Sequence, residues 1–277
     1  MTKKESYRGI EHVVPSSRPV RFFVDRLVDH YVEGPEIQEK ENLEEARGMS
    51  QQEGTGIVFV GNHLSNADYP VLIKALRMSG FTNPSADTVA ILGIRLYANL
   101  ASRIGIRTAP HIKVFPPTET PKNEEEKRNA QAMNINALRA QKRVLRVGMN
   151  TLIYPQGGRE PHEITRIPPP QISGFLDYGI VLPFGLVGTD QVLPMKKRIP
   201  KRASASIVFG EPFLGQDLKE QFNNLPRDER RAAMINEIMT RIAICLPPDY
   251  RGVYAGAVEK ARGLSARDNN VAISISE

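Results

Sequence analysis

Short apolar runs recur along the chain, each bounded by glycine, proline or polar residues. The runs lie at residues 57–60, 89–93, 104–108, 151–154, 180–186 and 205–209. Their length and their content of β-branched residues predict buried strands. Because segments with helical spacing separate several of these runs, strands alternate with helices. Such alternation predicts an α/β fold, in which helices flank a central sheet.

Apolar residues at steps of three and four predict the helices. The clearest segment carries a narrow apolar seam from Ala130 to Val147 and ends at Gly148. A second predicted helix begins at Pro226, and a third covers residues 70–78. Proline at a helix start and glycine just past a helix end suit these positions.

Residues 1–52 are expected to form a small helical appendage on the main domain. Helical spacing after Pro19 predicts one helix, and a charged segment at residues 36–47 predicts another. The α/β domain is assigned to residues 53–262, and a polar tail to residues 263–277. The sequence shows no internal repeat, so one main domain is predicted.

The net charge of the chain indicates which kinds of partner it can bind. The 277 residues include 37 Lys and Arg against 31 Asp and Glu, a net charge of +6. This excess favours acidic partners such as phosphorylated metabolites, anionic lipid or an acidic carrier protein. Nucleic acid is disfavoured, because the chain has no tryptophan and aromatic residues rarely interleave with the basic clusters. A single cysteine, Cys245, excludes a disulfide framework and a cysteine-based metal site, and we expect no metal.

No targeting segment is evident at the start of the sequence. The first residues lack the apolar core of a secretory signal. No apolar run approaches the roughly 20 residues that a membrane-spanning helix requires. We therefore expect a cytoplasmic protein that is soluble or peripherally bound to a membrane.

The residues after the apolar run 57–60 are the first candidate for chemistry. Gly61 and Asn62 end the run, and His63 and Asp68 follow within a short polar turn. Open α/β sheets place their sites at the carboxyl ends of strands. A carboxylate bonded to one ring nitrogen fixes the histidine tautomer and leaves the other nitrogen free to accept a proton. The alternative is a histidine that only caps the strand or packs in the core.

The residues after the run 151–154 form a second candidate. Gly157 and Gly158 allow the backbone to approach a ligand closely, and Arg159 offers a forked donor that suits phosphate. A tight turn with a solvated arginine is the alternative.

A third candidate follows the run 104–108. Arg107, His111 and Lys113 are compatible with anion binding, with a solvated loop as the alternative. Cys245 lies on the apolar face of a predicted helix, where an inert core thiol is expected. The sequence has no Gly-x-Ser-x-Gly elbow, no His-Glu-x-x-His pair and no phosphate loop.

Two of these blocks together resemble the glycerolipid acyltransferases. Residues 62–68 read Asn-His-Leu-Ser-Asn-Ala-Asp and are similar to the Asn-His-x-(Ser/Thr)-x-x-Asp block of that family. Residues 155–160 read Pro-Gln-Gly-Gly-Arg-Glu and are similar to the Pro-Ser-Gly-Gly-Arg-Asp form of the soluble, plastid-type glycerol-3-phosphate 1-acyltransferases. The resemblance covers about residues 55–215 and implies a mixed central sheet flanked by helices.

The resemblance implies transfer of a fatty acyl group from a thioester to the hydroxyl of glycerol 3-phosphate, a step of phospholipid biosynthesis. His63 would act as the general base, and Asp68 would orient the ring and stabilise the imidazolium. The acyl donor would be acyl carrier protein or coenzyme A, with no other cofactor. The alternatives are acylation of lysophosphatidate or another hydroxylated acceptor, and a non-catalytic lipid- or carrier-binding protein on the same fold.

The resemblance also implies roles for further residues. His111 and Arg159 would hold the acceptor phosphate, and Arg107 or Lys113 would supply further charge. A pocket for the acyl chain or for close backbone approach is expected from the remaining motif residues, Ser65, Gly157 and Gly158.

Three positions depart from the family pattern. Pro110 and Pro161 stand where a lysine and a second arginine are usual, and Gln156 stands where many relatives carry glutamate. The predicted basic helix and the basic cluster at residues 195–202 are expected to dock an acidic carrier protein or an anionic membrane surface, or to be plain solvated faces.

Overall fold

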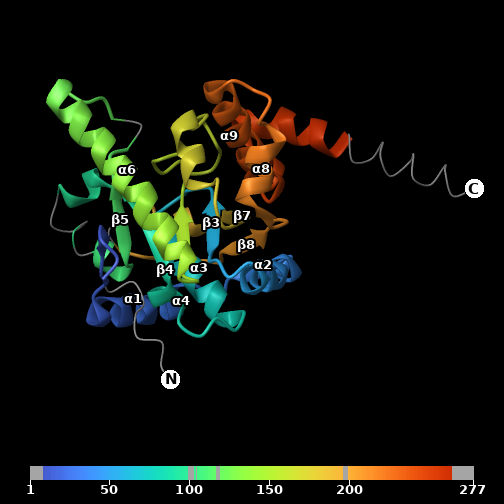
Figure 1. Ribbon diagram of the computed structural model, residues 1–277. Helices are drawn as coiled ribbons and strands as arrows, with labels where there is room; N and C mark the ends of the chain where they lie inside the picture. The colour runs from blue at the N-terminus through green and yellow to red at the C-terminus, as the bar shows by residue number, and fades with distance from the viewer. Residues whose placement is uncertain (1–8, 99–102, 104, 117–118, 196–198, 264–277) are drawn as a thin grey trace, which may run out of the picture.

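A mixed sheet of nine strands runs through the computed structural model, which describes residues 9–98, 103, 105–116, 119–195 and 199–263 (Figure 1). The strand order is β1-β5-β4-β6-β3-β7-β8-β2, and β9 pairs with β7. The strands are β1 (Val13–Val14), β2 (Glu36–Gln38), β3 (Ile57–Gly61), β4 (Thr88–Gly93), β5 (His111–Val114), β6 (Asn150–Ile153), β7 (Ile180–Val187), β8 (Ser206–Phe209) and β9 (Phe213–Leu214). Neighbours from β5 to β7 are parallel, whereas β1, β8 and β9 pair antiparallel with their neighbours in this core. The predicted α/β fold with a mixed central sheet is confirmed.

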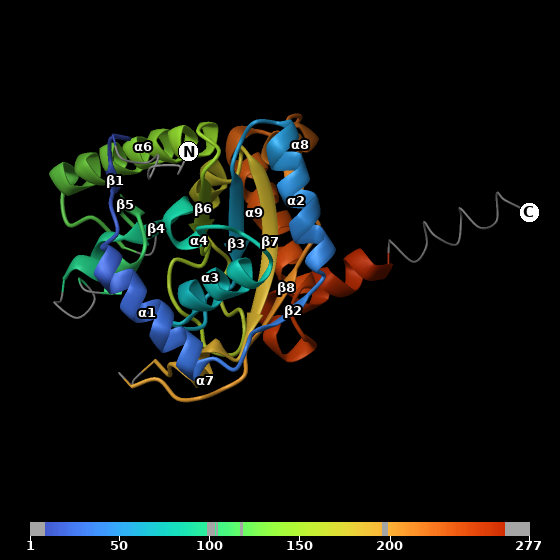
Figure 2. The same ribbon diagram turned by 90° about the horizontal axis from the view of Figure 1, so that it is seen from below.

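Helices cover both faces of the sheet. They are α1 (Arg18–Tyr31), α2 (Lys40–Gln52), α3 (Asp68–Met78), α4 (Pro84–Asp87), α6 (Glu124–Arg146), α7 (Thr189–Val192), α8 (Gly215–Gln221) and α9 (Arg227–Ile244). Short 3₁₀ turns are η1 (Ile94–Tyr97), η2 (Ile106–Thr108), η3 (Pro170–Phe175), η4 (Pro248–Tyr250) and η5 (Gly252–Tyr254). Helices α6 and α9 pack on one face with η3 between them, and α2 and α3 lie on the other, with α1 packed on α3 (Figure 2). No helix within the described ranges is both long and apolar enough to cross a membrane.

The sequence of helix α6 explains where this helix begins and ends. The Asn123 side chain accepts a hydrogen bond from the Glu126 backbone N–H at 2.8 Å, which caps the amino end. Three glutamates in the first turn and arginines in the last complement the helix dipole. The seam that includes Ala137, Ala140 and Val144 is buried, as predicted, whereas Val147 lies past the helix end and is exposed.

The strand expected at residues 104–108 is wrong. That segment contains the 3₁₀ turn η2, and the strand at this place is β5, which begins at His111. β5 pairs with β4 and β1, and its exposed Lys113 breaks the apolar run that would have marked it in the sequence. The correction shifts the strand by several residues and moves His111 from a loop into the sheet.

Residues 1–52 are also not an appendage, because they supply both edges of the sheet. β1 pairs with β5 at one edge, and β2 pairs with β8 at the other. The helix expected at residues 36–47 begins only at Lys40 and continues to Gln52. The sequence does not reveal these edge strands, because β1 is only two residues long and β2 has a single half-buried residue, Ile37. Apart from Gly263, the predicted polar tail lies outside the described residues.

Parallel pairing in the centre of the sheet positions the candidate site. β3 lies between β6 and β7, and Val60 is in register with Ile153 of β6. All residues of β3 and β6 are buried. The loops that leave β3 and β6 therefore emerge side by side at the carboxyl edge of the sheet, where α/β folds place their sites.

Candidate active site

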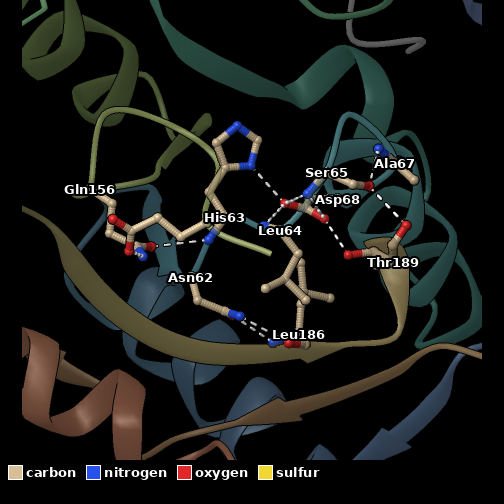
Figure 3. Close-up of polar contacts among 10 residues, drawn as sticks. Asn62, His63, Leu64, Ser65, Ala67, Asp68, Gln156, Leu186 and Thr189 are labelled. Carbon is tan, nitrogen blue, oxygen red and sulfur yellow. Dashed lines mark hydrogen bonds and ion pairs between the residues drawn. The ribbon is translucent and has the colours of Figure 1, made fainter. Parts of the chain in front are cut away.

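His63 and Asp68 meet directly, as the sequence predicted. The His63 Nδ1 lies 2.6 Å from Asp68 Oδ2 (Figure 3). Asp68 is the first residue of α3 and is fully buried, whereas 21% of the His63 side chain is exposed. Because a carboxylate can only accept, Nδ1 donates the proton, and Nε2 is left as the acceptor. No described residue forms a hydrogen bond with Nε2, so this nitrogen is open to a substrate.

Several donors fix the Asp68 carboxylate. Oδ2 accepts from the Leu64 backbone N–H at 2.7 Å, and the Ser65 N–H lies 3.0 Å from the same oxygen. The Thr189 hydroxyl donates to Oδ1 at 2.5 Å. A buried carboxylate requires such partners, and this set directs its remaining lone pair at His63.

Thr189 is a site residue that the sequence reasoning missed. It opens α7 immediately after Gly188, which turns the chain with φ of 82° at the end of β7. The available signal was the Gly-Thr pair directly after the longest apolar run, a position equivalent to Gly61-Asn62 at the end of β3. Thr189 lies 121 residues from Asp68, and only the pairing of β3 with β7 brings them together.

Ser65 does not line a pocket, contrary to the prediction. Its hydroxyl donates to the Thr189 carbonyl at 2.9 Å and accepts from the Ala67 N–H at 2.9 Å, and the side chain is fully buried. Asn62 plays a similar part, since its amide group exchanges two hydrogen bonds with the Leu186 backbone, at 2.9 and 2.7 Å. These two residues hold the turn that carries His63 against β7.

The second sequence block is joined to His63 through backbone groups. The His63 N–H donates to Gln156 Oε1 at 3.1 Å, and the Glu160 N–H donates to the His63 carbonyl at 2.7 Å. Gln156 Nε2 in turn donates to Glu160 Oε2 at 2.5 Å. The two loops expected to cooperate are therefore one hydrogen-bonded unit. Gln156 acts through its amide, which both accepts and donates.

The Glu160 carboxylate accepts three further hydrogen bonds within this loop. It accepts from the Thr165 N–H at 3.0 Å, from the Thr165 hydroxyl at 2.7 Å and from Arg166 Nε. Burial acts to raise the pKa of Glu160, but the hydrogen bonds from Arg166, Thr165 and Gln156 outweigh it and lower the pKa. Glu160 is thus an ionised anchor for Arg166.

Arg159 lies in the same loop. Its side chain is half-buried, and no described residue pairs with its guanidinium. Gly157 has φ of 67°, a backbone conformation that favours glycine. A methyl group at Gly158 would lie 3.3 Å from the Arg166 guanidinium, so this arginine packs directly over the loop. Arg166 is a second cation near Arg159 that the sequence reasoning missed.

The structure does not bring His111 to His63. His111 is buried, its Nδ1 donates to the Ala109 carbonyl at 3.0 Å, and its Nε2 accepts from the Tyr97 hydroxyl. Burial lowers the pKa of His111, which keeps the ring neutral. Register places it level with Phe59 of β3, three strand spacings of about 4.8 Å or about 14 Å away across the sheet. The phosphate-binding role that the family resemblance implied for His111 does not fit this buried position, where both ring nitrogens already have partners.

Arg107 and Lys113 belong to the same distant region. Arg107 is exposed in η2, and the Lys113 ammonium lies 4.1 Å from the centroid of the Tyr97 ring. Neither residue has a described contact with the His63 turn. The described residues also contain no cluster of three His, Cys, Asp or Glu that could hold a metal ion.

The chain is similar to known acyltransferases in both sequence and structure. The family model described as Acyltransferase matches residues 34–196, which include both sequence blocks. Among solved structures, the chain is similar to the 1-acyl-sn-glycerophosphate (LPA) acyltransferase PlsC from Thermotoga maritima, at 17% identity and a TM-score of 0.48, covering 80% of this chain and 75% of that one. The curated proteins yield no match.

Proposed function

Because the chain belongs to the Acyltransferase family, we propose that it transfers a fatty acyl group from an acyl thioester to the hydroxyl of glycerol 3-phosphate, in phospholipid biosynthesis. The observation that carries this proposal is the His63–Asp68 pair, joined at 2.6 Å with the Nε2 edge open. A histidine held in this tautomer by a buried carboxylate is suited to remove a proton from a hydroxyl group.

The proposed reaction is a direct transfer. His63 Nε2 takes the proton of the acceptor hydroxyl while the oxygen attacks the thioester carbonyl carbon. The tetrahedral intermediate collapses with cleavage of the C–S bond, and the imidazolium returns its proton to the leaving thiolate. Asp68 stabilises the imidazolium between these steps without taking the proton itself.

Two arginines supply charge for the acceptor phosphate in this proposal. Arg159 is adjacent to Glu160, whose N–H bonds the His63 carbonyl, so its backbone lies beside the base. Arg166 packs over Gly158 in the same loop with its Nε bonded to Glu160, so its two terminal nitrogens would stand in for the arginine that Pro161 replaces. Forked donors of this kind bind phosphate oxygens in pairs. Lysophosphatidate carries the same phosphate group and is the second candidate acceptor.

The acyl donor is proposed to be acyl carrier protein or coenzyme A, both of them anionic. The net charge of +6 favours such partners, as it favours contact with an anionic membrane. Part of the basic cluster at residues 195–202 lies outside the described residues.

A thiol-release assay tests the base. His63→Ala should reduce turnover by about 10²- to 10⁴-fold, the usual contribution of a general base. His30→Ala is the matched control, because His30 is exposed on α1 and should leave turnover unchanged. Retention of most activity in His63→Ala would refute the proposed role.

An acceptor panel at a fixed acyl donor tests the substrate. Glycerol 3-phosphate, lysophosphatidate and glycerol differ in acyl chain and phosphate, so the order of their kcat/KM values identifies the acceptor. A preference for lysophosphatidate would overturn glycerol 3-phosphate as the substrate. Binding of donors without thiol release for any acceptor would instead favour a non-catalytic lipid- or carrier-binding protein.

A further inference from the structure

The ring of Tyr154 lies flat against the imidazole of His63. The two ring centroids are 4.3 Å apart and the planes differ by 6°. Tyr154 is the first residue after β6, and His63 is the second residue after β3, so the parallel pairing of these strands creates the contact. One face of the imidazole is therefore covered by an aromatic ring, in addition to the carboxylate bond at its edge.

A second aromatic residue packs against Tyr154. Phe184, a buried residue of β7, packs edge-to-face with Tyr154 at a centroid distance of 6.4 Å and an interplanar angle of 73°. A side chain at Gly61 would collide with this Phe184 ring, because a Cβ there would lie 2.4 Å from it. The glycine that ends β3 thus makes room for the phenylalanine that fixes the tyrosine.

The hydroxyl of Tyr154 does not explain its position. It is buried, and no described residue forms a hydrogen bond with it. Burial, with the charges of Asp68 and Tyr69 as lesser causes, raises the pKa of Tyr154 well above its ordinary value, so the hydroxyl stays protonated. The ring, and not the hydroxyl, makes the contacts with His63 and Phe184.

We propose that Tyr154 is a positioning residue for His63. The Tyr154 ring fixes the plane of the imidazole, so that Nε2 points at the acceptor hydroxyl. This inference rests on the proposed acyl transfer, in which His63 becomes positively charged after it takes the proton. An aromatic face attracts a cation, so the same contact favours the imidazolium that forms during turnover. Without the ring, the Asp68 bond alone would let the imidazole tilt away from the reacting hydroxyl.

Two substitutions separate the ring from the hydroxyl. Tyr154→Phe keeps the stack and should retain kcat within about twofold, whereas Tyr154→Leu should lower kcat by about 10- to 100-fold, because small displacements of a catalytic group carry costs of this size. The acceptor KM should stay within about threefold in both variants, since no substrate contact is removed. Full kcat in the leucine variant would overturn the proposal. An equal loss in the phenylalanine variant would also overturn it, because the hydroxyl would then carry the effect.

A measurement independent of activity tests the stack itself. The ring protons of His63 should show an upfield ring-current shift in NMR spectra of the wild type and of Tyr154→Phe, and should lose it in Tyr154→Leu. If the leucine variant does not fold, Tyr154→Met, whose flexible side chain adapts to irregular gaps, supplies the same kinetic and NMR comparison. Absence of the shift in the wild type would refute the stack. Absence of acyl transfer in the wild type, with the shift present, would instead refute the proposed function.

Discussion

Exchanging Gln156 for glutamate would place two carboxylates where the fold now pairs an amide with a carboxylate. Gln156 Nε2 donates to Glu160 Oε2 at 2.5 Å, and both side chains are buried. Gln156 Oε1 also accepts from the His63 N–H, so the amide satisfies one donor and one acceptor at once. A glutamate at this position preserves the acceptor and loses the donor.

The cost follows from the distance between the carboxylates. Two charges about 3 Å apart repel by about 5 kcal/mol at an effective dielectric constant of about 20. The pair can instead bind one proton, which at pH 7 costs a glutamate with an ordinary pKa of about 4.3 only about 4 kcal/mol. Because protonation is the cheaper route, Gln156→Glu should lower the free energy of unfolding by about 3 to 4 kcal/mol at pH 7.

The penalty should depend on pH with a definite sign. Hydrogen bonds from Arg166 and Thr165 keep Glu160 ionised. The glutamate introduced at position 156 therefore takes the proton, and the pKa of this new glutamate is raised in the folded state. A group whose pKa is higher in the folded than in the unfolded state stabilises the fold at pH values below its unfolded-state pKa. This stabilisation is lost as the pH rises through the folded-state pKa. The penalty should therefore shrink to about 1 kcal/mol at pH 5, since each pH unit corresponds to about 1.4 kcal/mol.

Urea unfolding at pH 5 and pH 7 measures both quantities. Gln131→Glu on the exposed surface of α6 is the matched control and should change stability by less than about 0.5 kcal/mol. The double variant Gln156→Glu, Glu160→Gln restores an amide opposite a carboxylate and should lose the pH dependence, while the Thr165 N–H loses its acceptor. A penalty below about 1 kcal/mol at pH 7, or one independent of pH, would show that the two side chains are not coupled as described.

Three further predictions concern the supports and the substrate. Thr189→Val removes a hydrogen bond to the charged Asp68 and should lower both kcat and stability, the latter by about 2 kcal/mol in chemical denaturation; unchanged kcat and stability would contradict its role. Gly61→Ala should destabilise the fold by about 1 to 3 kcal/mol in the same assay, because the new methyl group overlaps Phe184, and wild-type stability would show that the ring can move aside. Arg159→Ala should raise the acceptor KM by about 10- to 100-fold, as expected for a lost hydrogen bond to a charged group, and leave the donor KM unchanged; steady-state kinetics with an unaltered acceptor KM would remove Arg159 from the phosphate site.

The sequence predicts the centre of the fold better than its edges. β3 and β7 are buried on both faces, so they appear as continuous apolar runs. β2 and β5 lie toward the edges; β2 has only one half-buried residue and β5 mixes buried with exposed residues, so neither appears as a continuous apolar run. The same limit explains the misplacement of His111, which lies in β5 and not in a loop after a strand at residues 104–108.

The sequence also predicts the residues that meet locally and misses those that meet through the sheet. His63 and Asp68 are five residues apart, and their spacing is visible in the sequence. Thr189 bonds Asp68 across 121 residues, and Tyr154 stacks on His63 from another strand. No periodicity records such contacts, because strand order and register decide them.

His63 and Asp68 are close in the sequence, whereas the residues that hold their turn in place are far away along the chain. This difference has a consequence for the order of folding. Gln156 reaches His63 across 93 residues, and Asn62 reaches Leu186 across 124. Closing loops of this length is entropically costly, so contacts between distant strands form late compared with local ones. In a refolding experiment, helical circular dichroism should recover before enzymatic activity. The time at which activity appears would then report when the central parallel strands assemble.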